Sequence, residues 1–147
     1  PDARGVFFGL SAIHTKRDML RAVMEGVAYS LRDWFEICRE MGIDISDMTA
    51  CGGGGTSSLW RQMLADLYKC PVKTSASKEG PALGAAILAA VGAGIYSSVP
   101  EACSAIVKTD KTQQPISENI PKYDSCYKLY TEIYPALKDK FKVLAKL

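Results

Sequence analysis

The sequence predicts an α/β domain, and three observations lead to this fold class. Segments with strand character alternate with segments whose apolar residues recur every three or four positions, a pattern typical of α/β folds. The chain has 147 residues, 48% of them apolar, which is enough for one globular domain with a core. No internal repeat or low-complexity tract points to another architecture.

The first part of the chain predicts a strand, a long helix and a second strand. RGVFFGL, residues 4–10, has strand character. Thr15 and Asp18 have the spacing of a capping box, so a helix is expected to begin there and to end near Gly42. The apolar face of this helix comprises Leu20, Val23, Val27, Leu31, Trp34, Cys38 and Met41. DMTACGG, residues 47–53, is expected to be a short strand that leads into a glycine turn.

The middle of the chain predicts a helix, a strand and a helix of small residues. Ser57–Tyr68 is expected to be helical and to bury Leu59, Met63, Leu64 and Leu67. PVKTS, residues 71–75, is expected to be a strand. A helix rich in Ala and Gly then begins near Pro81 and ends at Gly92 and Gly94.

The last part of the chain predicts two helices separated by a loop. Ser98 and Glu101 form a second capping box, which opens a short helix to about Val107. Residues 109–121 are polar and predict a loop. A final helix over 122–146 is expected to be kinked or restarted by Pro135. Its expected core positions are Tyr127, Tyr130, Ile133, Tyr134, Leu137, Phe141 and Leu144.

Composition excludes several classes of function. The 18 basic and 16 acidic residues are scattered and leave a net charge of +2, so no nucleic-acid partner is expected. No apolar run is long enough to span a membrane. The five cysteines contain no C-x-x-C pair and are expected to be buried, reduced thiols, which favours a cytoplasmic protein. They are Cys38, Cys51, Cys70, Cys103 and Cys126.

The stretch CGGGGTSSLW, residues 51–60, is the strongest candidate for a binding site. A glycine turn between a strand and a helix offers backbone N–H groups and the positive end of a helix dipole to a phosphate or ribose. The P-loop pattern fails because Ser57 and Ser58 replace the required Gly and Lys. The Rossmann pattern fails at its third glycine, where Ser57 stands, and at the ribose-binding acid, which TSAS replaces. Tight packing of strand and helix remains the alternative explanation.

Read with its neighbours, the stretch resembles a known family. GGGGTSSLWRQMLADLYKCPV is followed by EGPALGAAILAAVGAG and preceded by RAVMEGVAYSLRD and DARGVFFGL. These segments resemble the C-terminal domain of the FGGY carbohydrate kinases in order and spacing, from Pro1 to about Val107. The resemblance implies an actin-like ATPase, ribonuclease H-like fold. The whole sequence, 1–147, would then be the C-terminal, nucleotide-binding part of the second domain of a two-domain sugar kinase.

The resemblance also implies a reaction. The family transfers the γ-phosphoryl group of MgATP to a sugar hydroxyl, and the sequence is most similar to members that convert D-xylulose to D-xylulose 5-phosphate. Gluconate, ribulose, rhamnulose and glycerol kinases remain alternatives within the family. A non-catalytic, actin-like nucleotide-binding module is the alternative outside it. A native Met directly before Pro1 would favour that module.

Four residues are carried over as cofactor-binding positions. Gly52, Gly53 and Gly54 correspond to the turn that approaches the nucleotide, and Ser57 to a contact with its adenine end. Gly55 and Thr56 stand where members vary. No catalytic or metal-binding residue is expected here, because the family's catalytic Asp and its N-terminal, sugar-binding domain lie upstream of Pro1. The segment alone is therefore expected to be inactive and to work with its own N-terminal domain, ATP and Mg²⁺, with a homodimer left open.

Other polar and aromatic residues are expected to be structural. His14 precedes a helix and has no metal-site pattern, so a capping role is expected. Arg21 and Glu25 are four residues apart and are expected to pair on a helix surface. Trp34 and Trp60 are expected in the core. Glu79 is interpreted equally well as a helix-start acid or as a residue beside the nucleotide turn.

Overall fold

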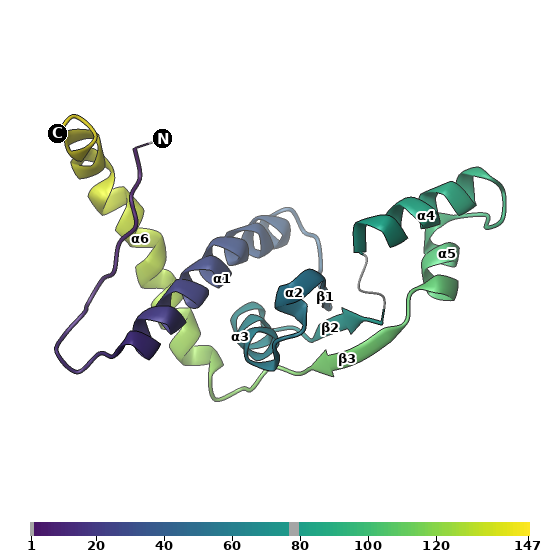
Figure 1. Cartoon of the computed structure of the whole chain (residues 1–147), viewed down its shortest axis with the longest axis horizontal. Helices are drawn as coiled ribbons and strands as arrows, with labels where there is room; N and C mark the ends of the chain where they lie inside the picture. Colours follow the sequence, from purple (N-terminus) through teal and green to yellow (C-terminus); the bar gives the residue numbers. More distant parts are fainter. Residues whose placement is uncertain (1, 77–79) are drawn as a thin grey trace. The chain divides into compact units, whose positions relative to one another are not determined.

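The computed structural model describes residues 2–76 and 80–147, and these fall into two compact units (Figure 1). One unit comprises Pro1–Ile43 and Ser117–Leu147, and the other comprises Asp44–Ile116. The first unit is helical, whereas the second contains the sheet.

Helix α1, Lys16–Glu40, begins and ends as the sequence predicts. The backbone N–H and hydroxyl of Thr15 both donate to Asp18 Oδ2 at 2.7 Å, and the Thr15 side chain accepts in return from the backbone of Asp18. This capping box satisfies N–H groups that have no partner within the helix. At the other end Gly42 adopts a φ of 75°, which only glycine adopts readily, and the chain leaves the helix.

Helices α1 and α6, Ile120–Leu144, pack through aromatic rings. The buried Tyr29 of α1 lies with its ring centroid 5.3 Å from that of Tyr130 and 6.1 Å from that of Tyr127. Burial raises the pKa of Tyr29, and nearby Cys126 and Glu25 add to the shift. The core of this unit is therefore a cluster of tyrosines.

The buried face of α1 is not the face that periodicity indicates. Leu20 is 57% exposed and Trp34 67% exposed, so the expectation that this stripe and Trp34 form the core is wrong. Ala28, Tyr29 and Arg32 are buried instead, because α6 contacts the face that carries them. On α6 the buried position of Phe141 is confirmed, whereas Tyr134 and Leu144 are more than half exposed.

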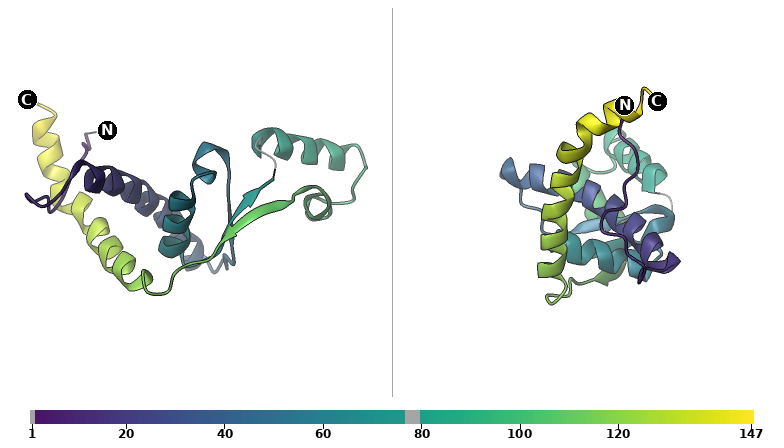
Figure 2. Two further views of the ribbon diagram at one scale, coloured as in Figure 1. Left: turned by 60° about the horizontal axis from the view of Figure 1, so that its bottom comes forward. Right: turned by 90° about the vertical axis from the view of Figure 1, so that its left-hand side faces the viewer.

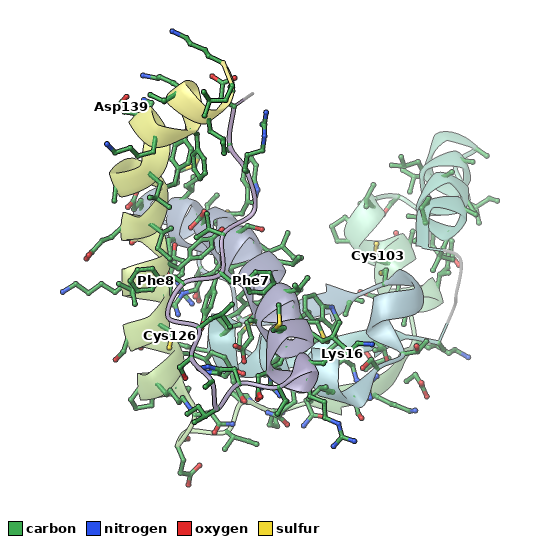
Figure 3. The ribbon with its side chains drawn as sticks, turned by 60° about the vertical axis from the view of Figure 1, so that its left-hand side comes forward. Phe7, Phe8, Lys16, Cys103, Cys126 and Asp139 are labelled. Atoms are coloured by element: carbon green, nitrogen blue, oxygen red, sulfur yellow. The ribbon has the colours of Figure 1, made fainter. Side chains whose placement is uncertain are left out.

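The N-terminal residues of this unit form no strand, contrary to the expectation for residues 4–10. A strand requires a partner for its backbone hydrogen bonds, and in the described residues none lies beside this segment. Figure 3 shows Phe7 on the side of α1 and Phe8 on the side of α6. Phe8 and Leu129 help line a small apolar hollow of about 200 Å³, so the segment packs through side chains.

The second unit is built on a mixed three-stranded sheet (Figure 2). Strand β1, Met48–Ala50, pairs in parallel with β2, Val72–Ser75, and β2 pairs antiparallel with β3, Thr109–Gln113. Thr74 of β2 faces Ala50 on one side and Lys111 on the other. Strands β1 and β2 confirm the sequence prediction, whereas β3 replaces part of the predicted loop.

Two helices connect β1 to β2. Helix α2, Gly52–Gly55, is one turn formed by the four glycines, and α3, Ser58–Tyr68, packs on β2 and β3. The α3 side chains Met63, Leu64 and Leu67 are buried, as predicted, but Leu59 is 50% exposed. Leu59 lies in the first turn of α3, at the N-terminal end of the helix.

Helix α4, Gly80–Gly92, and helix α5, Val99–Ile106, lie side by side (Figure 1). Ser98 caps α5 by accepting from the backbone N–H of Glu101 at 3.4 Å. The Glu101 carboxylate accepts from the backbone N–H of Ser97 at 2.9 Å. The predicted capping box would have this carboxylate accept from Ser98, so the second bond of the box lies one residue earlier. Glu79 lies outside the described residues.

Three further expectations have clear outcomes. Helix α6 runs uninterrupted through Pro135, so it does not restart there. All five cysteines are free, but only Cys70 is buried, while Cys51 and Cys126 are exposed. Among the described helices, none is both long and apolar enough to cross a membrane.

Candidate functional site

A pocket of about 350 Å³ lies where β1 ends and the glycine turn begins. We call it the glycine pocket. Its volume is within the range of small-molecule sites. All of its lining belongs to the second unit: Ala50, Cys51, Gly52, Gly53, Gly55, Thr56, Arg61, Thr74, Ser75, Ala76, Asp110 and Lys111.

Backbone forms the wall of this pocket at the glycine turn. Gly52 has a φ of +72°, which L side chains rarely adopt, so the chain can bend sharply away from β1 there. A Cβ placed on Gly53 would have no heavy atom within 4 Å among its described surroundings. The open space beside Gly53 therefore leaves its backbone accessible to a ligand.

The far end of the turn is packed tightly. A Cβ on Gly55 would lie 2.8 Å from the carbonyl oxygen of Ala50, closer than real contacts allow. The carbonyl of Gly55 accepts a 2.6 Å hydrogen bond from Nη1 of Arg61, which is 6% exposed. Packing explains the glycine at position 55, whereas it does not explain the glycine at position 53.

Side chains from three further elements complete the pocket. The hydroxyl of Thr56 donates to the carbonyl of Gly53 at 2.7 Å and fixes the turn. Thr74 Oγ1 accepts from the backbone N–H of Lys111 at 3.2 Å, which joins β2 to β3. Arg61 and Lys111 supply two positive charges and Asp110 one negative charge, so the lining favours an anionic ligand.

The predicted site residues divide into two pairs. Gly52 and Gly53 line the glycine pocket. Gly54 and Ser57 do not line it. A Cβ on Gly54 would meet the ring of the half-buried Trp60 at 3.4 Å, and Ser57 Oγ accepts from the backbone N–H of Trp60 at 3.3 Å, which makes Ser57 the N-cap of α3.

Sequence reasoning missed Arg61, Thr74 and Lys111. Arg61 lies in the first turns of α3, four residues after the cap, and this spacing was the available signal. Thr74 and Lys111 are 37 residues apart and meet only through the register of β2 and β3. The sequence contains no signal for that register, because β3 is polar throughout.

The described residues do not make up a metal site. Across residues 2–76 and 80–147, no group of three or more His, Cys, Asp or Glu side chains is placed to hold an ion. Asp110 is the carboxylate in the glycine pocket, and Mg²⁺ would also need phosphate oxygens and waters to complete its six ligands. No step that involves the metal is assigned to these residues.

Arg21, Glu25 and His14 of the first unit form hydrogen bonds within that unit. Arg21 Nε donates to Glu25 Oε1 at 2.8 Å, which confirms the predicted pair, and Arg21 Nη2 also donates to the Tyr123 hydroxyl at 2.7 Å. Burial raises the pKa of Tyr123 despite the opposing bond from Arg21. His14 Nδ1 accepts from the backbone N–H of Ser11 at 2.9 Å, which places His14 in a local turn before α1.

Comparison with known proteins links this geometry to one family. Residues 1–93 match the family model described as the FGGY family of carbohydrate kinases, C-terminal domain. The chain is 41% identical over 135 residues to the xylulose kinase of Staphylococcus epidermidis, covering 92% of this chain and 27% of that protein. It is 33% identical over 152 residues to the ribulokinase of Bacillus licheniformis, covering 99% of this chain and 28% of that protein.

A solved structure shows the same fold. The crystal structure of xylulose kinase from Rhodospirillum rubrum superposes with a TM-score of 0.84 at 32% identity, over 97% of this chain and 29% of that one. The chain therefore spans under a third of the length of the proteins that it matches. The correspondence includes both units of the present structure.

Proposed function

The chain belongs to the FGGY family of carbohydrate kinases, and from this premise we propose that it supplies the adenosine side of the ATP site of a sugar kinase. Its α/β, actin-like fold is that of the family's solved structures. The reaction would be transfer of the γ-phosphoryl group of MgATP to a sugar hydroxyl. The described residues bind and orient the nucleotide in this proposal, and the acceptor is activated elsewhere.

The observation that carries the proposal is the open space beside Gly53. The glycine pocket is lined there by backbone, and packing against the described residues does not require a glycine at position 53. A nucleotide that lies against the turn gives a reason for this glycine that packing does not give. Gly52 then bends the chain, and Gly53 leaves room for the ligand.

Gly54 and Ser57 have a less direct part in this proposal. Both lie next to Trp60 and outside the pocket lining, so they shape the end of the turn. Ser57 reaches the adenine end only if its hydroxyl exchanges its contact with the Trp60 N–H for one with the ligand. We retain both residues as cofactor-binding positions of second importance.

Phosphoryl transfer needs a base on the acceptor hydroxyl and donors around the γ-phosphate. Among the described residues, the lining of the glycine pocket contains no hydrogen-bonded pair that could act as a general base. Within that described part, it also contains no group of side chains that could hold a metal ion. We therefore propose that the 147 residues alone are inactive and that an N-terminal, sugar-binding domain completes the site. Mg²⁺ would neutralise phosphate charge when bound, held by residues other than those described.

D-Xylulose is the proposed acceptor, because identity to a xylulose kinase is 41%, against 33% to a ribulokinase. Ribulose, gluconate, rhamnulose or glycerol is the alternative within the family. A nucleotide-binding module without catalysis is the alternative outside it. A cytoplasmic location is supported by the bacterial relatives and by the free thiols. A homodimer is compatible with the proposal.

The Gly53→Val variant of the complete kinase polypeptide tests the proposed site. A side chain at Gly53 would occupy the space of the nucleotide, so we expect the KM for ATP to rise at least tenfold while the KM for the sugar changes little. Gly92→Val is the matched control, because Gly92 is an exposed helical glycine with nothing within 4 Å and lies outside the pocket. An unchanged KM for ATP in folded Gly53→Val would place the nucleotide elsewhere.

A further inference from the structure

Two arginines are more than nine-tenths buried, and their surroundings differ. Arg32 is 5% exposed, and its Nε and Nη2 bind Glu36 at 2.9 Å and Asp124 at 2.7 Å. Its guanidinium also lies 4.2 Å from the centre of the Tyr127 ring. Nη1 of Arg32 is buried without a hydrogen-bond partner, but two carboxylates and an aromatic ring compensate its charge within the fold.

Arg61 has no such compensation among the described residues. Its hydrogen bond is to the neutral carbonyl of Gly55, and its Nε is buried without a partner. No carboxylate of residues 2–76 or 80–147 forms an ion pair with it, Asp110 of the same pocket included. A buried charge without a counter-charge is costly, because it has lost its hydration without gaining a partner.

The position of Arg61 indicates where the counter-charge comes from. Arg61 lines the glycine pocket together with Gly53 and Lys111, so an anion bound there lies beside a guanidinium that lacks one. The bond from Nη1 to Gly55 leaves other N–H donors of the guanidinium for a ligand. A planar guanidinium matches phosphate oxygens better than any other side chain does.

We propose that Arg61 is a phosphate-binding residue, whose guanidinium pairs with the phosphate chain of the nucleotide in the glycine pocket. This inference rests on the proposed function, since it takes the nucleotide as the ligand. Arg61 then acts twice: its bond to Gly55 holds the glycine turn, and its charge meets the phosphate. Lys111 lies on the same lining and adds to the positive potential.

Binding of a graded set of ligands to the complete polypeptide tests the proposal. Dissociation constants for ATP, ADP, AMP and adenosine are measured by competition with a fluorescent ATP analogue. In Arg61→Met we expect affinity for ATP and ADP to fall 10- to 100-fold, as for the loss of a charge-assisted bond. Affinity for adenosine, which has no phosphate, should fall much less, because adenosine loses only the support that the bond to Gly55 gives the turn.

Arg32→Met is the matched control. It removes a guanidinium that is equally buried but is paired within the first unit, so we expect lower thermal stability and unchanged dissociation constants for all four ligands. Arg61→Lys keeps the charge and loses the fork geometry. It should lie between wild type and Arg61→Met for ATP, and it serves as the main variant if Arg61→Met does not fold.

Two results would overturn the proposal. Equal losses for ATP and adenosine would show that Arg61 only supports the shape of the turn. Unchanged affinity for ATP in Arg61→Met, or in Arg61→Lys if that is the folded variant, would show that the phosphate lies elsewhere. Failure of the proposed function is recognised separately, because Gly53→Val would then leave the KM for ATP unchanged as well.

Discussion

A side chain on Gly55 would overlap the carbonyl oxygen of Ala50, since a Cβ built there lies 2.8 Å from it. Two residues earlier, a Cβ built on Gly53 has nothing within 4 Å of it among the described residues. The four glycines of α2 are therefore not equivalent. Position 52 needs a positive φ, position 55 needs close packing, and position 53 needs neither.

The first prediction concerns stability. Gly55→Ala should lower the free energy of unfolding by about 1–3 kcal/mol, because the added methyl group must displace the backbone of β1 or the turn. Gly53→Ala is the matched variant and should change it by less than about 1 kcal/mol. Urea denaturation followed by circular dichroism measures both. Equal effects at the two positions would contradict this assignment.

The second prediction concerns acid stability. Burial alone would raise the pKa of Glu36, but the hydrogen bond from Arg32 and the charges of Arg39 and Arg32 hold it below its ordinary value of 4.5. A carboxyl group with a lowered folded pKa stabilises the fold fully above its unfolded pKa. This contribution is lost as the pH falls from about 4.5 through the lower folded value.

Glu36→Gln should therefore be less stable than wild type at pH 7, and the difference should shrink as the pH falls below 4.5. Thermal midpoints measured across this range give the comparison. Glu132→Gln, on an exposed position of α6, is the control and should leave the pH dependence unchanged. A constant difference between Glu36→Gln and wild type at all pH values would show that the ion pair with Arg32 does not set this pKa.

The third prediction concerns cysteine reactivity. Cys51 and Cys126 are exposed and should react first with iodoacetamide, whereas buried Cys70 should react last. Cys51 lines the glycine pocket, so MgATP should slow its alkylation in the complete polypeptide. Cys126 lies in the other unit and is the internal control. Peptide mass spectrometry follows each thiol, and equal protection of the two would point to a general change in accessibility.

The fourth prediction concerns activity. The 147-residue chain alone should show no sugar-dependent ATP consumption, because positioning of the acceptor cannot come from one side of a site. The complete polypeptide should phosphorylate D-xylulose with a higher kcat/KM than D-ribulose or gluconate. A coupled ADP assay measures both. Phosphorylation of D-xylulose by the isolated chain would contradict the proposed division of the site.

Local sequence signals predicted the helices well and their burial poorly. Thr15 and Asp18 determine where α1 begins, since a capping box involves only neighbours in sequence. Which face of α1 is buried depends on where α6 packs, and for that reason Trp34, expected in the core, is exposed while Tyr29 is buried. Amphipathic periodicity identifies a helix without identifying its partner.

The same distinction holds for the sheet and the site. Strand β3 has the sequence Thr-Asp-Lys-Thr-Gln and is mostly exposed. Its pairing with β2 therefore comes from backbone hydrogen bonds, which a hydropathy pattern does not predict. Gly52 and Gly53 could be found from the sequence because they stand in a motif. For Arg61 the sequence offers only its spacing from the cap of α3, because its buried state and missing counter-charge exist only in the folded protein.

The order of elements in the sheet has a consequence for the folding pathway. Strands β1 and β2 pair within residues 48–75, with α2 and α3 between them, so somewhat less loop-closure entropy is lost when they meet than when β3 joins β2. Strand β3 must return to β2 over more than thirty residues and should join later. Mutating Met63 in the core of α3 should thus slow folding, whereas Thr112→Gly in β3 should mainly speed unfolding. Stopped-flow measurements of both rates test this order. If it holds, the β1 and β2 sides of the glycine pocket form before the side that carries Lys111.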